Sequence, residues 1–183
     1  MAARGPVKVA LKMGAKLLPD AESGNAIAEI VGREKPDEVV VIGGHIDSWD
    51  VGDGSSDDGA GCLAAMEAAR LLVQAGLKPR RTIRVVLFTN EENGLRGGEG
   101  YFDAHGKEPH VGAIESDSGM GPPTGFSLAG DDAEALAALQ VYQPLFQRLG
   151  PLTIIAGWGG ADISPLTEAG VLSMALRPDA SHY

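Results

Sequence analysis

Two continuous apolar runs constrain the fold of this chain most strongly. Residues 38–44 read EVVVIGG and residues 82–90 read TIRVVLFTN, so both are rich in β-branched side chains and neither alternates with polar residues. Such runs are typical of interior strands that are covered on both faces of a sheet. Each run ends in glycine or in polar residues, which is where a strand is expected to stop. The chain is therefore expected to contain a buried, largely parallel sheet.

A helix pattern lies between these two runs. Cys62, Met66, Ala69 and Val73 recur at steps of four, three and four, which predicts an amphipathic helix over residues 59–75. Strand, helix and strand in this order predict a βαβ unit whose two strands are parallel.

The rest of the chain continues the alternation of strand and helix patterns. We expect further strands at residues 7–13, 25–32, 111–117, 152–157 and 171–177, and further helices at residues 95–105 and 163–169. Asp131 with Glu134 predicts a capping box, and the helix after it carries an apolar stripe that is expected to face the core, formed by Leu136, Leu139, Tyr142, Phe146 and Leu149. The whole pattern predicts one α/β domain over residues 1–183, built as three α/β/α layers around a largely parallel, mixed central sheet.

Composition excludes several classes of function. The 183 residues carry a formal net charge of −10, so no basic surface is expected to bind the phosphates of a nucleic acid. The single cysteine, Cys62, excludes an internal disulfide and a multi-cysteine zinc site. No apolar run approaches the roughly 20 residues of a membrane span. Residues 1–14 lack an apolar core like that of a signal peptide, so none is predicted, and the localisation stays open.

Ionisable side chains follow three predicted strands at the point where each strand ends. The carboxyl ends of parallel strands meet at one edge of a sheet, which is where open α/β folds place their sites. Repelling carboxylates at one edge need cations or shared protons to be stable. These residues are His45 and Asp47 after the first run, Glu91 and Glu92 after the second, Asp117 after the third, and Asp57 and Asp58 at the start of the first helix.

One imidazole with several carboxylates is a ligand set that suits zinc, manganese or cobalt. Alone, a His-x-Asp, a Glu-Glu pair or an Asp-rich loop is usually an ordinary surface feature; their coincidence at successive strand ends favours a metal site. Residues 53–64 do not form an EF-hand loop, because the sixth position is Asp58 and the twelfth is Ala64. The sequence also lacks a His-Glu-x-x-His helix, a Gly-x-Ser-x-Gly elbow and a Walker loop.

Three motifs in order carry a resemblance to a known family. GGHIDSWDVGDGSSDDGAG (residues 43–61), RVVLFTNEENGLRGGEGY (84–101) and ESDSG (115–119) resemble the di-zinc exopeptidases that include bacterial leucyl aminopeptidases and carboxypeptidase Q. The stretches GHIDSWDVG and ESDSG are most similar to those of the carboxypeptidase Q-like branch. The resemblance covers essentially the whole chain and implies the zinc-exopeptidase (phosphorylase/hydrolase-like) architecture.

The resemblance implies two zinc ions and assigns four ligands. His45 and Asp117 match the ligands of one metal, Glu92 matches a ligand of the other, and Asp57 matches the carboxylate that bridges both. It also implies a second histidine ligand several residues beyond the last strand. His182 is a candidate for that ligand, but we expect it to be a neighbour of the true ligand rather than the ligand itself. We therefore expect one metal to be held tightly and the second weakly, unless a partner chain supplies the imidazole.

The resemblance further implies two catalytic carboxylates. Glu91 matches the general base that takes a proton from the attacking water, and Asp47 matches the carboxylate that orients the His45 ring. The N-terminal region and the accessory domain of the carboxypeptidase Q branch have no counterpart in the chain. It is thus expected to be a fragment of a longer peptidase that also lacks the C-terminal end, and its own activity is in doubt. The family is often secreted or periplasmic.

The expected substrate is a dipeptide or short peptide, with no nucleic acid or membrane partner, and the chain is compatible with a homo-oligomer. Two alternatives stay open: a non-catalytic metal- or partner-binding domain on the same scaffold, and a metal-dependent amide deacylase. A binding domain has no use for an uncoordinated Glu91 beside Glu92, whereas an enzyme does. The sequence does not decide between aminopeptidase and carboxypeptidase.

Overall fold

In a computed structural model of the chain, which describes residue 5 and residues 8–179, the strands form one seven-stranded sheet. Its order is β1-β3-β2-β4-β7-β5-β6. The strands are β1 (Ala26–Ile30), β2 (Lys35–His45), β3 (Arg81–Phe88), β4 (His110–Glu115), β5 (Pro123–Ala129), β6 (Thr153–Gly157) and β7 (Ser173–Pro178). The helices are α1 (Gly59–Gln74), α2 (Arg96–His105), α3 (Ala133–Gln140), the 3-10 helix η1 (Gln143–Leu149) and α4 (Ser164–Glu168).

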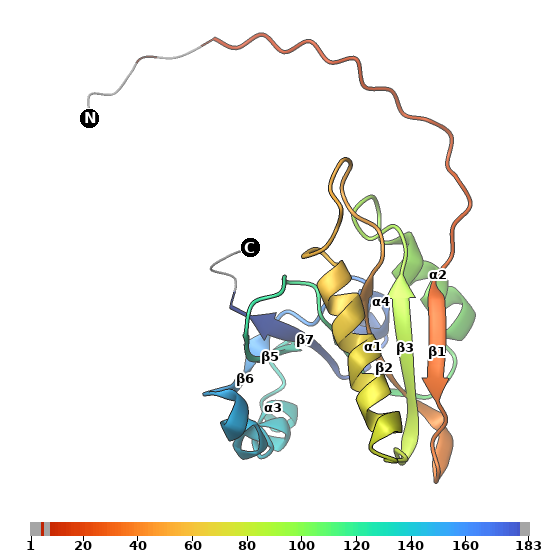
Figure 1. The fold of residues 1–183 in the computed structure, drawn as a ribbon, viewed down its shortest axis with the longest axis vertical. Coiled ribbons are helices and arrows are strands. Elements are labelled where there is room, and N and C mark those ends of the chain that lie inside the picture. Colours follow the sequence, from red (N-terminus) through yellow and green to blue (C-terminus); the bar gives the residue numbers. More distant parts are fainter. Residues whose placement is uncertain (1–4, 6–7, 180–183) are drawn as a thin grey trace.

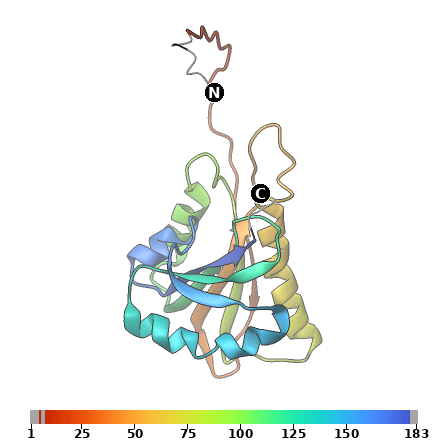
Figure 2. The same ribbon diagram turned by 90° about the vertical axis from the view of Figure 1, so that its left-hand side faces the viewer.

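The sheet is mixed and mostly parallel, as expected. β2 pairs in parallel with both β3 and β4, and β4 pairs in parallel with β7. Only β1 with β3 and β5 with β7 are antiparallel. Helix α1 covers one face of the sheet, while α2 and α4 lie on the other, which gives three α/β/α layers (Figures 1 and 2).

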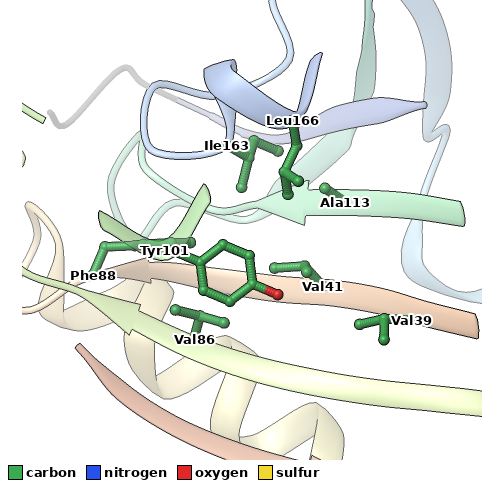
Figure 3. Packing of buried hydrophobic residues seen from close by; sticks show 8 residues of the cluster. All are labelled: Val39, Val41, Val86, Phe88, Tyr101, Ala113, Ile163 and Leu166. Carbon is green, nitrogen blue, oxygen red and sulfur yellow. The ribbon is translucent and has the colours of Figure 1, made fainter. Parts of the chain in front are cut away.

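The main core lies between the sheet and the α2 and α4 layer. Tyr101 of α2 stands at its centre and packs edge-on against Phe88 of β3, with ring centroids 5.9 Å apart (Figure 3). The other side chains of this cluster are Val39, Val41, Val86, Ala113, Ile163 and Leu166. These positions include the interior faces of β2, β3 and β4, so the continuous apolar runs were correctly read as strands that are covered on both sides.

Two expectations about elements were wrong, and one strand was not predicted. Residues 8–13 form no strand; they run away from the sheet as exposed chain (Figure 1), since an alternating pattern becomes a strand only where a neighbouring strand pairs with it. Helix α3 is capped by Asp132, not Asp131, because the helix begins one residue later and the Asp132 carboxylate accepts the N–H groups of Glu134 and Ala135. Strand β5 was missed, because Pro123 and Gly125 interrupt its pattern.

Two apolar faces also differ from their predicted positions. The buried side of α1 consists of Gly61, Cys62 and Ala65, while Met66 and Val73 are exposed. The stripe that begins at Leu136 does not stay on one helix: α3 ends at Gln140 and η1 begins at Gln143, where Pro144 cannot donate the N–H that a continuing α-helix needs. In the part of the chain that the structure describes, no helix is long and apolar enough to cross a membrane.

Candidate metal centre

Three candidate ligands converge at the carboxyl edge of the sheet. His45 is the last residue of β2, Asp117 lies two residues beyond β4, and Asp57 comes from the loop before α1, which rises above this edge in Figure 1. His45 Nε2 lies 3.1 Å from Asp57 Oδ1 and 3.5 Å from Asp117 Oδ1. Their ligand atoms all lie within 4.8 Å of one another, and among the described residues this is the one group of at least three such side chains.

The donor set fits a divalent cation. The imidazole of His45 is fully buried, and Asp57 and Asp117 are partly buried around it. Burial works to lower the pKa of His45, but the carboxylates of Asp117, Asp58 and Glu91 outweigh it and raise that pKa to about 10. This much negative potential around a buried ring is what a cation would neutralise. One nitrogen and two carboxylate oxygens suit zinc or another borderline metal.

The backbone of His45 is fixed by a neighbouring buried acid. Asp58 caps helix α1, since its Oδ1 accepts the Gly61 N–H, and its Oδ2 accepts the His45 N–H at 3.0 Å. Gly61 allows the start of α1 to pack closely against Ser116, which follows β4, because a Cβ at position 61 would lie 1.8 Å from the Ser116 carbonyl oxygen. Asp58 is thus a structural support of the candidate site and does not belong to the group of three candidate ligands. The helix-cap pattern could have identified this role.

Glu91 lies beside the three candidate ligands but outside their group. Its Oε2 is 3.9 Å from His45 Nε2. Burial, and then the nearby carboxylates of Asp117, Glu92 and Asp57, raise the pKa of Glu91 against the lowering effect of His45. A carboxyl group with a raised pKa near a candidate metal centre is suited to accept and return a proton. Glu92 has a pKa raised by burial and by Asp57, and it lines the same surface hollow as Asp57.

Asp47 connects His45 to the Glu91–Glu92 pair. Its two carboxylate oxygens accept the backbone N–H groups of Glu91 and Glu92, at 3.0 and 3.3 Å. One of these oxygens lies 3.5 Å from His45 Nδ1, and the Asp47 carbonyl oxygen lies closer to that nitrogen, at 3.0 Å. The Nδ1–H therefore points at Asp47, which leaves Nε2 free to face Asp57 and Asp117. The link to Glu91 and Glu92 was not visible in the sequence.

Two further buried acids lie near the candidate ligands and were missed by sequence reasoning. Glu115 has no exposed surface and accepts the N–H groups of Ala161 and Ile163. Asp162, between those two residues, is buried, and neither carboxylate oxygen has a hydrogen-bond partner among the described residues. No local sequence pattern identifies either residue, because the burial of their carboxyl groups depends on distant segments of the chain.

The remaining histidines are accounted for in part. His105 and His110 are both partly buried beside Tyr101, whose hydroxyl lies 2.8 Å from His110 Nε2. Helix α2 and strand β4 bring them together. His182, the weaker ligand candidate, lies outside the described residues.

Comparison with known proteins gives a consistent picture. The sequence profile described as "Peptidase family M28" matches residues 25–183. Carboxypeptidase Q of Rattus norvegicus is 41% identical over 186 residues, which is the whole of this chain and 39% of that protein. The chain thus spans about two fifths of the length of this curated relative.

Solved structures agree in fold. The crystal structure of a peptidase M28 precursor from Shewanella amazonensis aligns with a TM-score of 0.78 at 41% identity, over 87% of this chain and 36% of that one. A zinc aminopeptidase from Bacillus subtilis aligns with a TM-score of 0.67 at 22% identity, over 84% of this chain and 39% of that one, which supports the shared fold alone.

Proposed function

The chain belongs to peptidase family M28, and from that membership we propose that it carries the catalytic centre of a metal-dependent exopeptidase for dipeptides or short peptides. The observation that carries the proposal is the convergence of His45, Asp57 and Asp117 within 4.8 Å, with Glu91 beside them. Carboxypeptidase Q is a curated relative that matches over the whole chain, and a zinc aminopeptidase shares the fold.

His45, Asp57 and Asp117 would hold one zinc ion, and Asp57 with Glu92 would contribute to a second. The second set contains fewer ligands among the described residues, so we expect the first metal to bind more tightly. When bound, the metal polarises the scissile carbonyl and makes a water molecule more acidic.

Glu91 performs the proton transfers in this proposal. Its carboxylate accepts a proton from the attacking water and delivers it to the nitrogen of the leaving amine. The raised pKa of Glu91 makes the first step easier, because the protonated form that this step produces gains stability. Asp47 keeps the His45 ring in one tautomer and holds the backbone of Glu91 in place.

The test is a comparison of dipeptides with free and blocked ends, on this chain and on one extended beyond Tyr183. An exopeptidase hydrolyses the free dipeptide, loses this activity with a chelator and regains it with zinc, and cleaves poorly when the recognised terminus is acetylated or amidated. The blocked end that stops the reaction separates aminopeptidase from carboxypeptidase. Equal cleavage of a dipeptide blocked at both ends favours an amide deacylase. Zinc binding without any hydrolysis by the extended chain favours a metal-binding domain.

A further inference from the structure

The segment between β3 and α2, residues 89–95, carries the Glu91–Glu92 pair; we call it the acidic turn. It is anchored at both ends. The Thr89 N–H is donated to Asn25 Oδ1, and the Thr89 carbonyl oxygen accepts the N–H of Gly97 in α2. Within the turn, the carbonyl oxygen of Glu91 accepts the N–H groups of Gly94 and Leu95.

Two residues of the acidic turn have left-handed backbones although they are not glycine. Asn90 has φ 61° and Leu95 has φ 60°. Asparagine enters this region more easily than other residues with a side chain, whereas leucine does so at a cost. The two residues flank the Glu91–Glu92 pair, one on each side.

The left-handed residue before Glu91 has a geometric consequence. A left-handed residue next to right-handed ones turns successive backbone N–H groups toward one side, which forms a small concave site for an anion. Here the anion is the Asp47 carboxylate, which accepts the N–H groups of both Glu91 and Glu92. The same carboxylate lies 3.5 Å from His45 Nδ1. Asp47 therefore connects the Glu91–Glu92 pair with the candidate ligand His45, and the conformation of Asn90 affects this connection.

Asn90 acts through its backbone in this arrangement. Its Oδ1 is buried and has no hydrogen-bond partner among the residues that the structure describes. The side-chain oxygen therefore does not hold the turn, and what matters at this position is the ability to adopt positive φ. Glycine has that ability without any side chain, and a β-branched residue lacks it.

We propose that Asn90 is a positioning residue, whose left-handed backbone directs the N–H groups of Glu91 and Glu92 onto Asp47 and thereby fixes the direction of both glutamate side chains. The inference rests on the proposed function for its effect on catalysis, but its structural part does not. A general base must lie within hydrogen-bond reach of the proton that it takes. A small rotation of the turn therefore lowers the catalytic rate more than it weakens the binding of the substrate.

The experiment compares three variants with the wild-type protein. Asn90→Gly keeps the left-handed backbone, and Asn90→Val opposes it. Leu95→Val is the matched control, because it places the same β-branched residue at nearly the same φ in the same turn, beyond the two N–H groups that Asp47 accepts. Asn90→Ala serves as a milder second variant if Asn90→Val does not fold.

The first measurement is amide hydrogen exchange in the metal-free protein. Glu91 and Glu92 should be protected in the wild type, in Asn90→Gly and in Leu95→Val, and should lose protection in Asn90→Val or Asn90→Ala. Retained protection in the Asn90→Val and Asn90→Ala proteins would overturn the proposal whatever the activity.

The second measurement is kcat and KM for the dipeptide with zinc present. We expect Asn90→Val to lose about 10-fold to 100-fold in kcat with little change in KM. Asn90→Gly, the conservative variant, should restore most of the rate. An equal loss of kcat in Leu95→Val would show that strain in the turn, and not the direction of Glu91, is responsible. A Glu91→Gln protein in the same assay keeps the tests separate: if it is fully active, the proposed function fails, whereas if it is inactive and Asn90→Val is not impaired, only the role of Asn90 fails.

Discussion

At the scale of single residues, the candidate site depends on a buried histidine surrounded by acids. Asp117 and Asp57 face one nitrogen of His45, and Asp47 faces the other. Removing a carboxylate that faces Nε2 takes away a candidate ligand, whereas removing an acid elsewhere in the glycine-rich loop leaves the candidate ligands in place. Asp53 is such an acid, since it is exposed and stands apart from the group of three.

The corresponding prediction concerns zinc affinity. Asp117→Asn should weaken the binding of the tighter zinc ion by more than about 100-fold, because a neutral amide is a poor ligand for zinc. Asp53→Asn should leave the affinity unchanged. Competition with a zinc-chelating dye measures both. Equal affinity in the Asp117→Asn and wild-type proteins would remove Asp117 from the ligand set.

Asp162 leads to a prediction about pH. Burial, and then the neighbouring Glu115 carboxylate, raise the pKa of Asp162 from 3.8 to about 9 in the folded protein. Between these values the folded protein retains a proton that the unfolded chain has released, so the free energy of unfolding falls as the pH rises. The slope from this one group is at most about 1.4 kcal/mol per pH unit.

Asp162→Asn removes this dependence, because the amide is neutral at every pH and close in shape to a protonated carboxyl group. In a metal-free buffer, urea unfolding should show Asp162→Asn to be more stable than the wild type at pH 8, with a difference that shrinks toward pH 5. A variant that is less stable at pH 8 would mean that Asp162 is ionised and paired.

At the scale of elements, a buried polar network joins three strands to helix α2 on the far side of the core. The guanidinium group of Arg84 in β3 makes three contacts. Its Nε lies 2.6 Å from Glu29 Oε1 of β1, and its Nη1 lies 2.8 Å from the Tyr101 hydroxyl of α2. Its Nη2 lies 2.7 Å from Oε2 of Glu108, which precedes β4. The Tyr101 hydroxyl continues the network to His110 of β4. Arg84 is almost fully buried, while both glutamates are about one third exposed.

Arg84→Met should therefore destabilise the protein by about 2–3 kcal/mol, less than the loss of a fully buried pair, since water reaches the two glutamates. Arg70→Met is the control, because Arg70 pairs with Glu67 on the exposed side of α1 and its loss should not measurably change stability. Thermal and urea unfolding of both variants check this prediction. Similar behaviour of the two variants would mean that the network does not hold β3 and α2 together.

Elements whose environment is local were predicted well from the sequence, and those set by distant segments were not. The runs that became β2 and β3 identify themselves through β-branched side chains alone. The buried face of α1 was placed correctly at Cys62 and wrongly at Met66, because small residues such as Gly61 and Ala65 allow close packing on the sheet, while larger ones point outward. A pattern based on hydrophobicity favours the larger residues.

The same limit applies to the candidate site. His45 and Asp117 could be placed together because parallel strands end at one edge of a sheet. The supports around them, such as Glu115 and the contact of Asp47 with Glu91, depend on loops that return from distant parts of the chain. No spacing in the sequence records those loops.

At the scale of the whole molecule, the chain matches carboxypeptidase Q over its full length but spans only 39% of that relative. The described residues bring together one three-ligand group, with Glu91 beside it, at one edge of a mostly parallel sheet. We propose that the metal ligands and the general base are separate groups. A substitution at the base should therefore leave metal binding intact while it abolishes hydrolysis.

Zinc binding and dipeptide hydrolysis, measured together on a Glu91→Gln protein and on the wild type, test this claim most directly. The prediction is wild-type affinity for the tighter zinc ion and a loss of at least about 100-fold in kcat. Glu99→Gln, an exposed substitution on α2, should change neither quantity. Full hydrolysis by Glu91→Gln, or loss of the tighter zinc ion together with activity, would contradict the separation of ligand and base.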